Sequence, residues 1–137
     1  MDTNRLVVDS GPLIVLCDKA RWSRTQAWLE AMRLSQVVAV VPPAVITEFL
    51  HGTPDWRRAV WWLSHMRSVE TTSDICRAAG LLLRLTRDSG VSAVDAHVVQ
   101  HALNLNANIL TSDPRDIQLL LDAAGAKNEV FELPWPS

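Results

Sequence analysis

The feature that most constrains the fold is a repeated order in which a short apolar segment is followed by a helical pattern. The apolar segments are rich in Val, Ile and Leu, as buried strands are, and they occupy residues 5–8, 37–41, 108–111 and 130–133. Apolar residues at helical spacing lie between them, over residues 24–34, 43–50, 73–89, 92–105 and 117–123. This alternation predicts an α/β fold with a parallel central sheet flanked by helices.

Composition limits what this sheet can belong to. The chain has 137 residues, of which 48% are hydrophobic and 20% charged, so we expect one domain over residues 1–137 with a buried core and no disordered tract. The net charge of −2 lacks the basic excess of a general nucleic-acid binder. A polyanionic partner would therefore have to contact a local Arg patch or bound cations.

Cellular location also follows from the sequence. No apolar run reaches the roughly 18 residues of a membrane span, and the residues at 9–12 interrupt the N-terminal apolar stretch, so we expect neither a membrane helix nor a signal peptide. The two cysteines, Cys17 and Cys76, form no CxxC pair, and we interpret both as small core residues of a reduced protein. These features predict a cytoplasmic protein.

Four acidic residues fall where predicted strands end or helices begin. Asp9 follows the first apolar segment, Glu48 lies in the helix after the second, Asp95 opens the helix at 92–105, and Asp113 follows the strand at 108–111. The carboxyl ends of parallel strands share one edge of a sheet, so acids far apart in sequence are predicted to converge there. Carboxylate oxygens suit Mg²⁺ and Mn²⁺, and the convergence would be a metal site.

Each acid also has a purely structural interpretation. Asp9 and Asp113 are placed to cap the helices that follow them, and Asp95 is the third residue after Ser92, as in a capping box. Glu48 has apolar residues on both sides, so we predict that it lies near an apolar face, where a lone carboxylate is costly. The predicted placement of all four at one sheet edge favours a shared site.

Four short segments carry a resemblance to a known family. They are VVDSG at residues 7–11, VITEFL at 45–50, SAVDA at 92–96 and LTSD at 110–113. In order and spacing they resemble the PIN-domain ribonucleases, particularly the VapC-type toxins of bacterial toxin-antitoxin pairs. The resemblance covers essentially the whole chain. It implies a Rossmann-like sheet, RNA endonuclease activity dependent on Mg²⁺ or Mn²⁺, a homodimer and a cognate antitoxin.

The resemblance also implies roles for the acids. Asp9, Asp95 and Asp113 would be metal ligands directly or through water, and Glu48 would either bind metal or orient the attacking water. Asp116 follows Asp113 by three positions on the same predicted helix, where it can share or replace the fourth acidic role.

The chain departs from the family pattern near the first acid. Relatives often carry Ser or Thr two positions after it, whereas this chain has Gly11 there and a hydroxyl one position earlier, at Ser10. Thr111 is a candidate for shaping the site, although a strand residue of this type needs no such role.

Two other classes of protein compete with a nuclease. A non-catalytic α/β regulatory module, such as a receiver-like domain with an acidic Mg²⁺ pocket, would require a Lys near its last strands. The only lysines are Lys19 and Lys127, and neither ends a predicted strand. The second competitor is a PIN-like scaffold that only binds a partner, and the presence of all four acids argues against it.

Three further groups of residues have a possible binding role. His97 and His101 have the i, i+4 spacing of zinc-binding pairs, but no other Cys or His pair completes a tetrahedral set. Residues 55–66, rich in Trp and Arg, are predicted to form an arm, or a helix whose aromatic side packs against a dimer partner, an antitoxin or the core. We favour packing against a protein partner, with base stacking on RNA as the alternative. Arg84 and Arg87 are candidates for RNA contact, although a solvated helix face is commoner.

Overall fold

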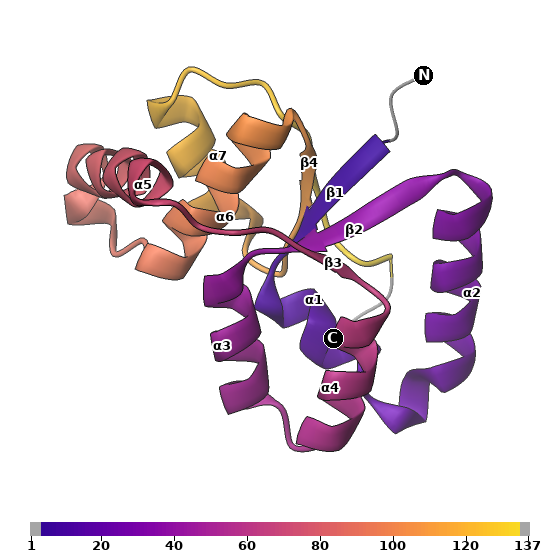
Figure 1. The fold of residues 1–137 in the computed structure, drawn as a ribbon. Coiled ribbons are helices and arrows are strands. Elements are labelled where there is room, and N and C mark those ends of the chain that lie inside the picture. Colours follow the sequence, from indigo (N-terminus) through magenta and orange to yellow (C-terminus); the bar gives the residue numbers. More distant parts are fainter. Residues whose placement is uncertain (1–3, 135–137) are drawn as a thin grey trace.

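The computed structural model describes residues 4–134, in which five parallel strands form one sheet in the order β3-β2-β1-β4-β5 (Figure 1). The strands are β1 (Asn4–Val8), β2 (Val37–Val41), β3 (Arg67–Ser68), β4 (Asn108–Leu110) and β5 (Val130–Phe131). Every neighbouring pair is parallel. The predicted α/β class and parallel sheet are therefore confirmed.

Helices connect the strands and supply most of the remaining structure. They are α1 (Ser10–Leu16), α2 (Trp22–Leu34), α3 (Pro43–Gly52), α4 (Trp56–Ser64), α5 (Ser73–Leu85), α6 (Ala93–Leu105) and α7 (Pro114–Ala123), with 3-10 turns η1 (Lys19–Arg21) and η2 (Arg87–Ser89). Within residues 4–134, no helix is both long and apolar enough to cross a membrane.

The helices form two groups around the sheet. Helices α5, α6 and α7 pack on one another at one side of the strands, whereas α1, α2 and α4 lie at the other (Figure 1). Helix α3 contacts α1, α4 and α6, so it bridges the two groups near the ends of β1 and β2. This arrangement brings the beginnings of α1, α6 and α7 close to one another.

The core is continuous from the central strands into both helix groups. The side chains of Val7 and Val8 in β1 and Ile109 in β4 are fully buried, as are Phe49 of α3 and Trp62 of α4. Burial on this scale fixes the strand ends, because a close-packed interior resists displacement of any one element. The residues that follow β1 and β4 are therefore held in defined positions.

The structure corrects several local predictions. Residues 55–66 are not an arm, because α4 buries Ala59 and Trp62 against the core. The helix predicted over 73–89 ends at Leu85 and is followed by a separate 3-10 turn, and strand β3 was not predicted. Cys17 is buried as expected, but Cys76 is exposed on α5.

Candidate metal centre

Hydrogen bonds join the ends of β1 and β4 at the edge predicted to hold the acids. Val8 pairs with Leu110, and the backbone N–H of Asp9 donates to the Leu110 carbonyl at 2.9 Å. The Thr111 hydroxyl then donates to Asp9 Oδ2 at 2.9 Å, and the Ser10 amide donates to Asp9 Oδ1 at 2.8 Å. Both oxygens of the buried Asp9 carboxylate are thus held by hydrogen bonds.

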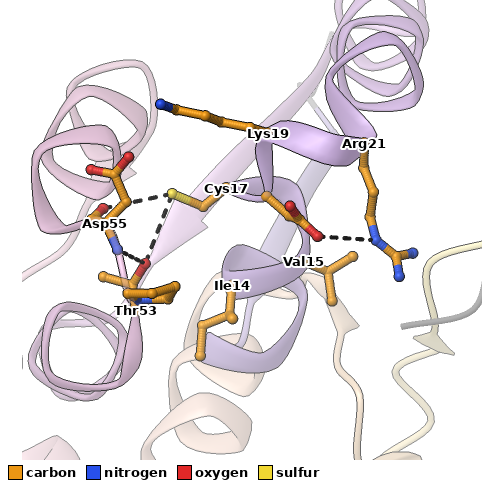
Figure 2. Close-up of a pocket in the computed structure, with 9 residues that line it drawn as sticks. Ile14, Val15, Cys17, Lys19, Arg21, Thr53 and Asp55 are labelled. Carbon is orange, nitrogen blue, oxygen red and sulfur yellow. Dashed lines mark hydrogen bonds and ion pairs between the residues drawn. The ribbon is translucent and has the colours of Figure 1, made fainter.

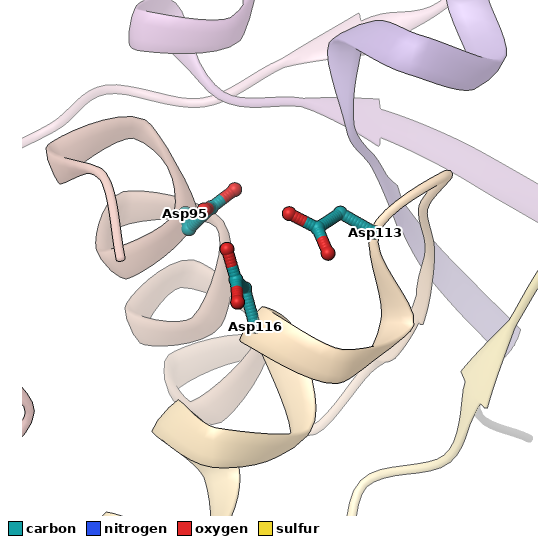
Figure 3. A group of neighbouring side chains, drawn as sticks. All are labelled: Asp95, Asp113 and Asp116. Atoms are coloured by element: carbon teal, nitrogen blue, oxygen red, sulfur yellow. The ribbon is translucent and has the colours of Figure 1, made fainter. Parts of the chain in front are cut away.

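Three other carboxylates form the closest acidic group. Asp95 at the start of α6 and Asp113 and Asp116 at the start of α7 point toward one another (Figure 3), and one oxygen from each lies within 4.8 Å of the others. Asp95 is buried, Asp116 is half-buried and Asp113 is exposed. This geometry gives a cation access from solvent on one side of the group.

Burial and charge crowding act on Asp95. Burial is the main reason that its pKa rises from the ordinary value of 3.8 to about 6, and the nearby carboxylates of Asp9 and Asp113 raise it further. Hydrogen bonds with Ser92 oppose the shift. A carboxylate in this environment is stabilised by a bound cation, since the cation offsets both the repulsion and the lost hydration.

The same crowding extends to the neighbouring acids. Burial raises the pKa of Asp9, and the carboxylates of Glu48 and Asp113 add to that rise against the lowering effect of its two hydrogen bonds. The pKa of Asp116 is raised mainly by its hydrogen-bonding contact with the Asp113 carboxylate. Asp9 therefore belongs to the electrostatic environment of the site, although it is not part of the closest group.

The environment of Glu48 differs from the apolar one that was predicted for it. Its side chain is exposed on α3, while Val45 and Phe49 on the same helix are buried, so the expectation of an apolar environment was wrong. The hydroxyl of Ser10 donates a hydrogen bond to Glu48 Oε1, which links Glu48 to the residue next to Asp9. Exposure explains why α3 can carry this carboxylate without a charged partner.

Helix capping accounts for only part of the acidic pattern. Asp95 completes a capping box, in which its backbone N–H donates to the Ser92 hydroxyl at 3.1 Å. Asp113 stands at the N-cap position of α7 but makes no side-chain capping bond, and the Asp9 carboxylate bonds only the first amide of α1. The Asp113 carboxylate is therefore turned to Asp116 instead of the amides of its own helix.

Sequence reasoning ranked some contributors too low. Asp116 was only an alternative to the fourth acid, yet it lies in the closest carboxylate group. Thr111 was given no preferred role, and its buried hydroxyl holds both Asp9 and, at 3.0 Å, the backbone N–H of Asp113. A hydroxyl residue directly after a buried strand and two positions before an acid is the signal that could have identified this link.

The histidine pair does not form a metal site. His101 is buried, and its Nε2 lies 2.7 Å from the Thr71 hydroxyl in a hydrogen bond. Burial lowers the pKa of His101, and nearby His97 lowers it further. Within the part of the chain that the structure describes, the three-carboxylate group is the one set of three or more close metal-ligand side chains.

A separate pocket of about 480 Å³ lies at the far end of α1 (Figure 2). It is lined by Cys17, Lys19, Thr53 and Asp55 among others, and none of the candidate acids lines it. The Cys17 thiol is buried there, which raises its pKa, and it lies within weak hydrogen-bonding distance of the Asp55 carbonyl. The pocket and the acidic group therefore have no residue in common.

Comparison with known proteins gives a family match. The family model described as "PIN domain" matches residues 6–120, which include Asp9, Glu48, Asp95, Asp113 and Asp116. No curated protein matches the chain by sequence.

Several solved structures have a similar fold. VapBC2 from Rickettsia felis, bound to a DNA fragment from its promoter, is 13% identical with a TM-score of 0.73, over 96% of this chain and 99% of that chain. VapC20 of Mycobacterium tuberculosis, a Sarcin-Ricin loop cleaving toxin, is 19% identical with a TM-score of 0.64, over 89% and 96%. FitAcB from Neisseria gonorrhoeae is 13% identical with a TM-score of 0.65, over 92% and 96%. At these identities the similarity concerns the fold.

We predict that Asp95→Asn raises the free energy of unfolding of the metal-free protein by about 1–3 kcal/mol near neutral pH. The folded-state pKa of Asp95 lies above its ordinary value, so the folded protein binds this proton more tightly than the unfolded chain does. Wild-type stability should therefore increase as the pH falls from above about 6 toward 3.8, and Asp95→Asn should reduce this dependence. Urea unfolding in EDTA at several pH values measures both effects.

The matched control is Asp88→Asn, which neutralises an exposed carboxylate in η2. It should leave the free energy of unfolding within about 0.5 kcal/mol of wild type. An Asp95→Asn variant that is less stable than wild type at neutral pH would show that repulsion at this position is not significant.

Proposed function

The chain belongs to the PIN domain family, and from this premise we propose that it is a metal-dependent endoribonuclease that hydrolyses RNA phosphodiester bonds. The observation that carries the proposal is the group of three carboxylates, from Asp95, Asp113 and Asp116, with oxygens within 4.8 Å of one another. Asp9 lies in the same electrostatic environment. The proposal treats residues 1–137 as one nuclease domain.

The donor set fits a hard divalent cation. It consists of carboxylate oxygens with solvent access, and it contains neither thiolate nor imidazole, which favours Mg²⁺, with Mn²⁺ as a substitute. The raised pKa of Asp95 supports this assignment, because the crowding that raises it is relieved when a cation binds. Exposed acidic groups without such crowding would not favour a cation in the same way.

A bound cation of this kind supplies charge neutralisation at the scissile phosphate and acidifies a coordinated water. We assign Asp9, Asp95 and Asp113 to hold it directly or through water, with Asp116 as an additional ligand. Thr111 and the Ser10 amide keep the Asp9 carboxylate in one orientation. Glu48, exposed and hydrogen-bonded to Ser10, either completes the ligand set or orients the attacking water.

The substrate is proposed to be RNA, and the setting a bacterial toxin-antitoxin pair in the cytoplasm. VapBC2 and FitAcB, which share the fold, and VapC20, described as a toxin that cleaves the Sarcin-Ricin loop, support this setting. Arg84 in the last turn of α5 and Arg87 in η2 are both exposed, where they can contact RNA phosphates. A regulatory module that binds Mg²⁺ without catalysis is the alternative.

We predict that the purified protein cleaves members of a small-RNA panel in Mg²⁺ or Mn²⁺ and not in EDTA. Asp95→Asn should reduce cleavage by about 100-fold or more, because it removes a charged ligand from the centre of the group. Asp116→Asn and Asp113→Asn, run in parallel, measure how the fourth acidic role is divided. Gel analysis of end-labelled RNA gives the rates.

Asp122→Asn, which neutralises an exposed carboxylate in the last turn of α7, is the control and should cut like wild type. Mn²⁺ binding by calorimetry without cleavage of any RNA would favour the non-catalytic Mg²⁺-binding module. If the protein neither cuts RNA nor binds Mn²⁺, the proposed metal site is wrong.

We propose that the protein is a homodimer and that α5 contributes to the interface. Leu81 and Leu85 are 63% and 70% exposed and lie one turn apart on α5, which makes an apolar face on an otherwise polar surface. Leu81→Lys with Leu85→Lys should shift the mass measured by light scattering from two chains to one. Ser35→Lys at the exposed end of α2 is the control, and a dimer that persists in the Leu variant would exclude this face.

We also propose a cognate antitoxin, for which the exposed aromatic residues of α4 are the expected contact. Trp56 and Trp61 are 61% and 45% exposed, and Trp61 is fixed by edge-to-face packing on Trp22 and Trp62. Rigid aromatic side chains bind protein partners at low entropic cost. This placement favours protein contact over base stacking by the whole Trp-rich segment, since Trp62 is buried.

The antitoxin should be encoded by a small reading frame that overlaps the upstream end of this gene. Co-expressed from there, it should co-purify with tagged protein and suppress RNA cleavage, and Trp56→Ser with Trp61→Ser should weaken co-purification. The Ser35→Ala variant, away from α4, is the control. Absence of any such reading frame would indicate a solitary RNA-processing enzyme.

A further inference from the structure

Gly11 and Ser112 share one space next to the acidic group. Gly11 lies in the first turn of α1, and Ser112 lies in the loop between β4 and α7. A Cβ atom built on Gly11 would lie 2.5 Å from Ser112 Oγ and 2.7 Å from Ser112 Cβ, closer than side chains can approach. Glycine at this position is therefore required by the close approach of the loop, and the Ser112 hydroxyl fills the place of the missing side chain.

The position of Ser112 is fixed on both sides by the site. Thr111, which precedes it, holds Asp9 and the backbone N–H of Asp113, the residue that follows it. Ser112 is exposed, and its hydroxyl makes no hydrogen bond to any residue within 4–134. A serine hydroxyl offers one donor and two acceptor positions, all available here to a ligand.

Ser10 is not available for the same role. Its side chain is buried, and its hydroxyl is donated to Glu48. The hydroxyl one position before Gly11 in sequence thus serves the α1–α3 contact, and the one that faces Gly11 comes from the β4–α7 loop.

We infer that Ser112 belongs to the metal and RNA-phosphate site, where its hydroxyl occupies the space left by the absent side chain of Gly11 beside Asp113. The inference rests on the proposed function and adds a residue to its site. The hydroxyl donates to a phosphate oxygen or to a water bound by the cation, and no covalent bond changes. Its contribution is therefore to ligand affinity.

The test compares Ser112→Ala with a swap, Gly11→Ser with Ser112→Gly, which moves the hydroxyl from the loop to α1 without enlarging the shared space. Ser112→Ala should weaken Mn²⁺ affinity, or raise the KM for RNA, by about 5- to 10-fold, the effect of one lost hydrogen bond. The swap should recover most of that loss. Calorimetry with Mn²⁺ alone, RNA cleavage kinetics and urea unfolding are measured on each variant.

Gly11→Ser alone is the steric control, and Ser35→Ala is the control for removing an exposed hydroxyl elsewhere. The first should lower stability and metal affinity together, because the loop must move; the second should change neither. A merely structural role for Ser112 would change the unfolding curve and leave Mn²⁺ affinity and KM at their wild-type values.

Wild-type Mn²⁺ affinity and KM in Ser112→Ala, with an active wild-type protein, would overturn this inference and leave the proposed function intact. A wild-type protein that neither binds Mn²⁺ nor cuts RNA would overturn the proposed function and this inference with it. Ser112→Ala decides between these outcomes even if the swap does not fold.

Discussion

The parallel pairing of β1 with β4 is the constraint on which the rest of the site depends. It aligns Val8 with Leu110 and so places Asp9 beside Thr111, where the threonine hydroxyl joins two segments 102 positions apart in sequence. Helices α6 and α7 then bring further carboxylates to that edge. The repulsion among them opposes folding, and the close-packed strands beneath resist the separation that would relieve it.

Most of the fold could be predicted because its long elements have strong patterns. The β-branched run of β2 and the capping box of α6 identify those elements from local sequence alone. Strand β3 has only two exposed residues, so no periodicity marks it. For helix α4 the sequence leaves open an arm or a helix packed on the core, because its Trp and Arg residues do not form one clean stripe. The burial of Trp62, a tertiary contact, determines that α4 packs on the core.

The sequence predicts the sheet edge at which the candidate site lies, but not which carboxylates form its closest group. Strand ends show where acids converge, but they do not show which carboxylates come within a few ångströms, and Asp116 therefore ranked below Glu48. Apolar neighbours in sequence suggested burial of Glu48, whereas adjacent helix positions face different directions. The close approach of Ser112 to Gly11 involves two segments far apart in sequence, so it could not be predicted from the local sequence of either segment.

The shared space of Gly11 and Ser112 has an evolutionary consequence. A side chain larger than that of glycine at position 11 would clash with the serine at position 112. A smaller residue at position 112 would leave a gap unless position 11 acquired a larger side chain. The two positions are thus expected to drift as a pair, by way of intermediates that lack the hydroxyl or overfill the space.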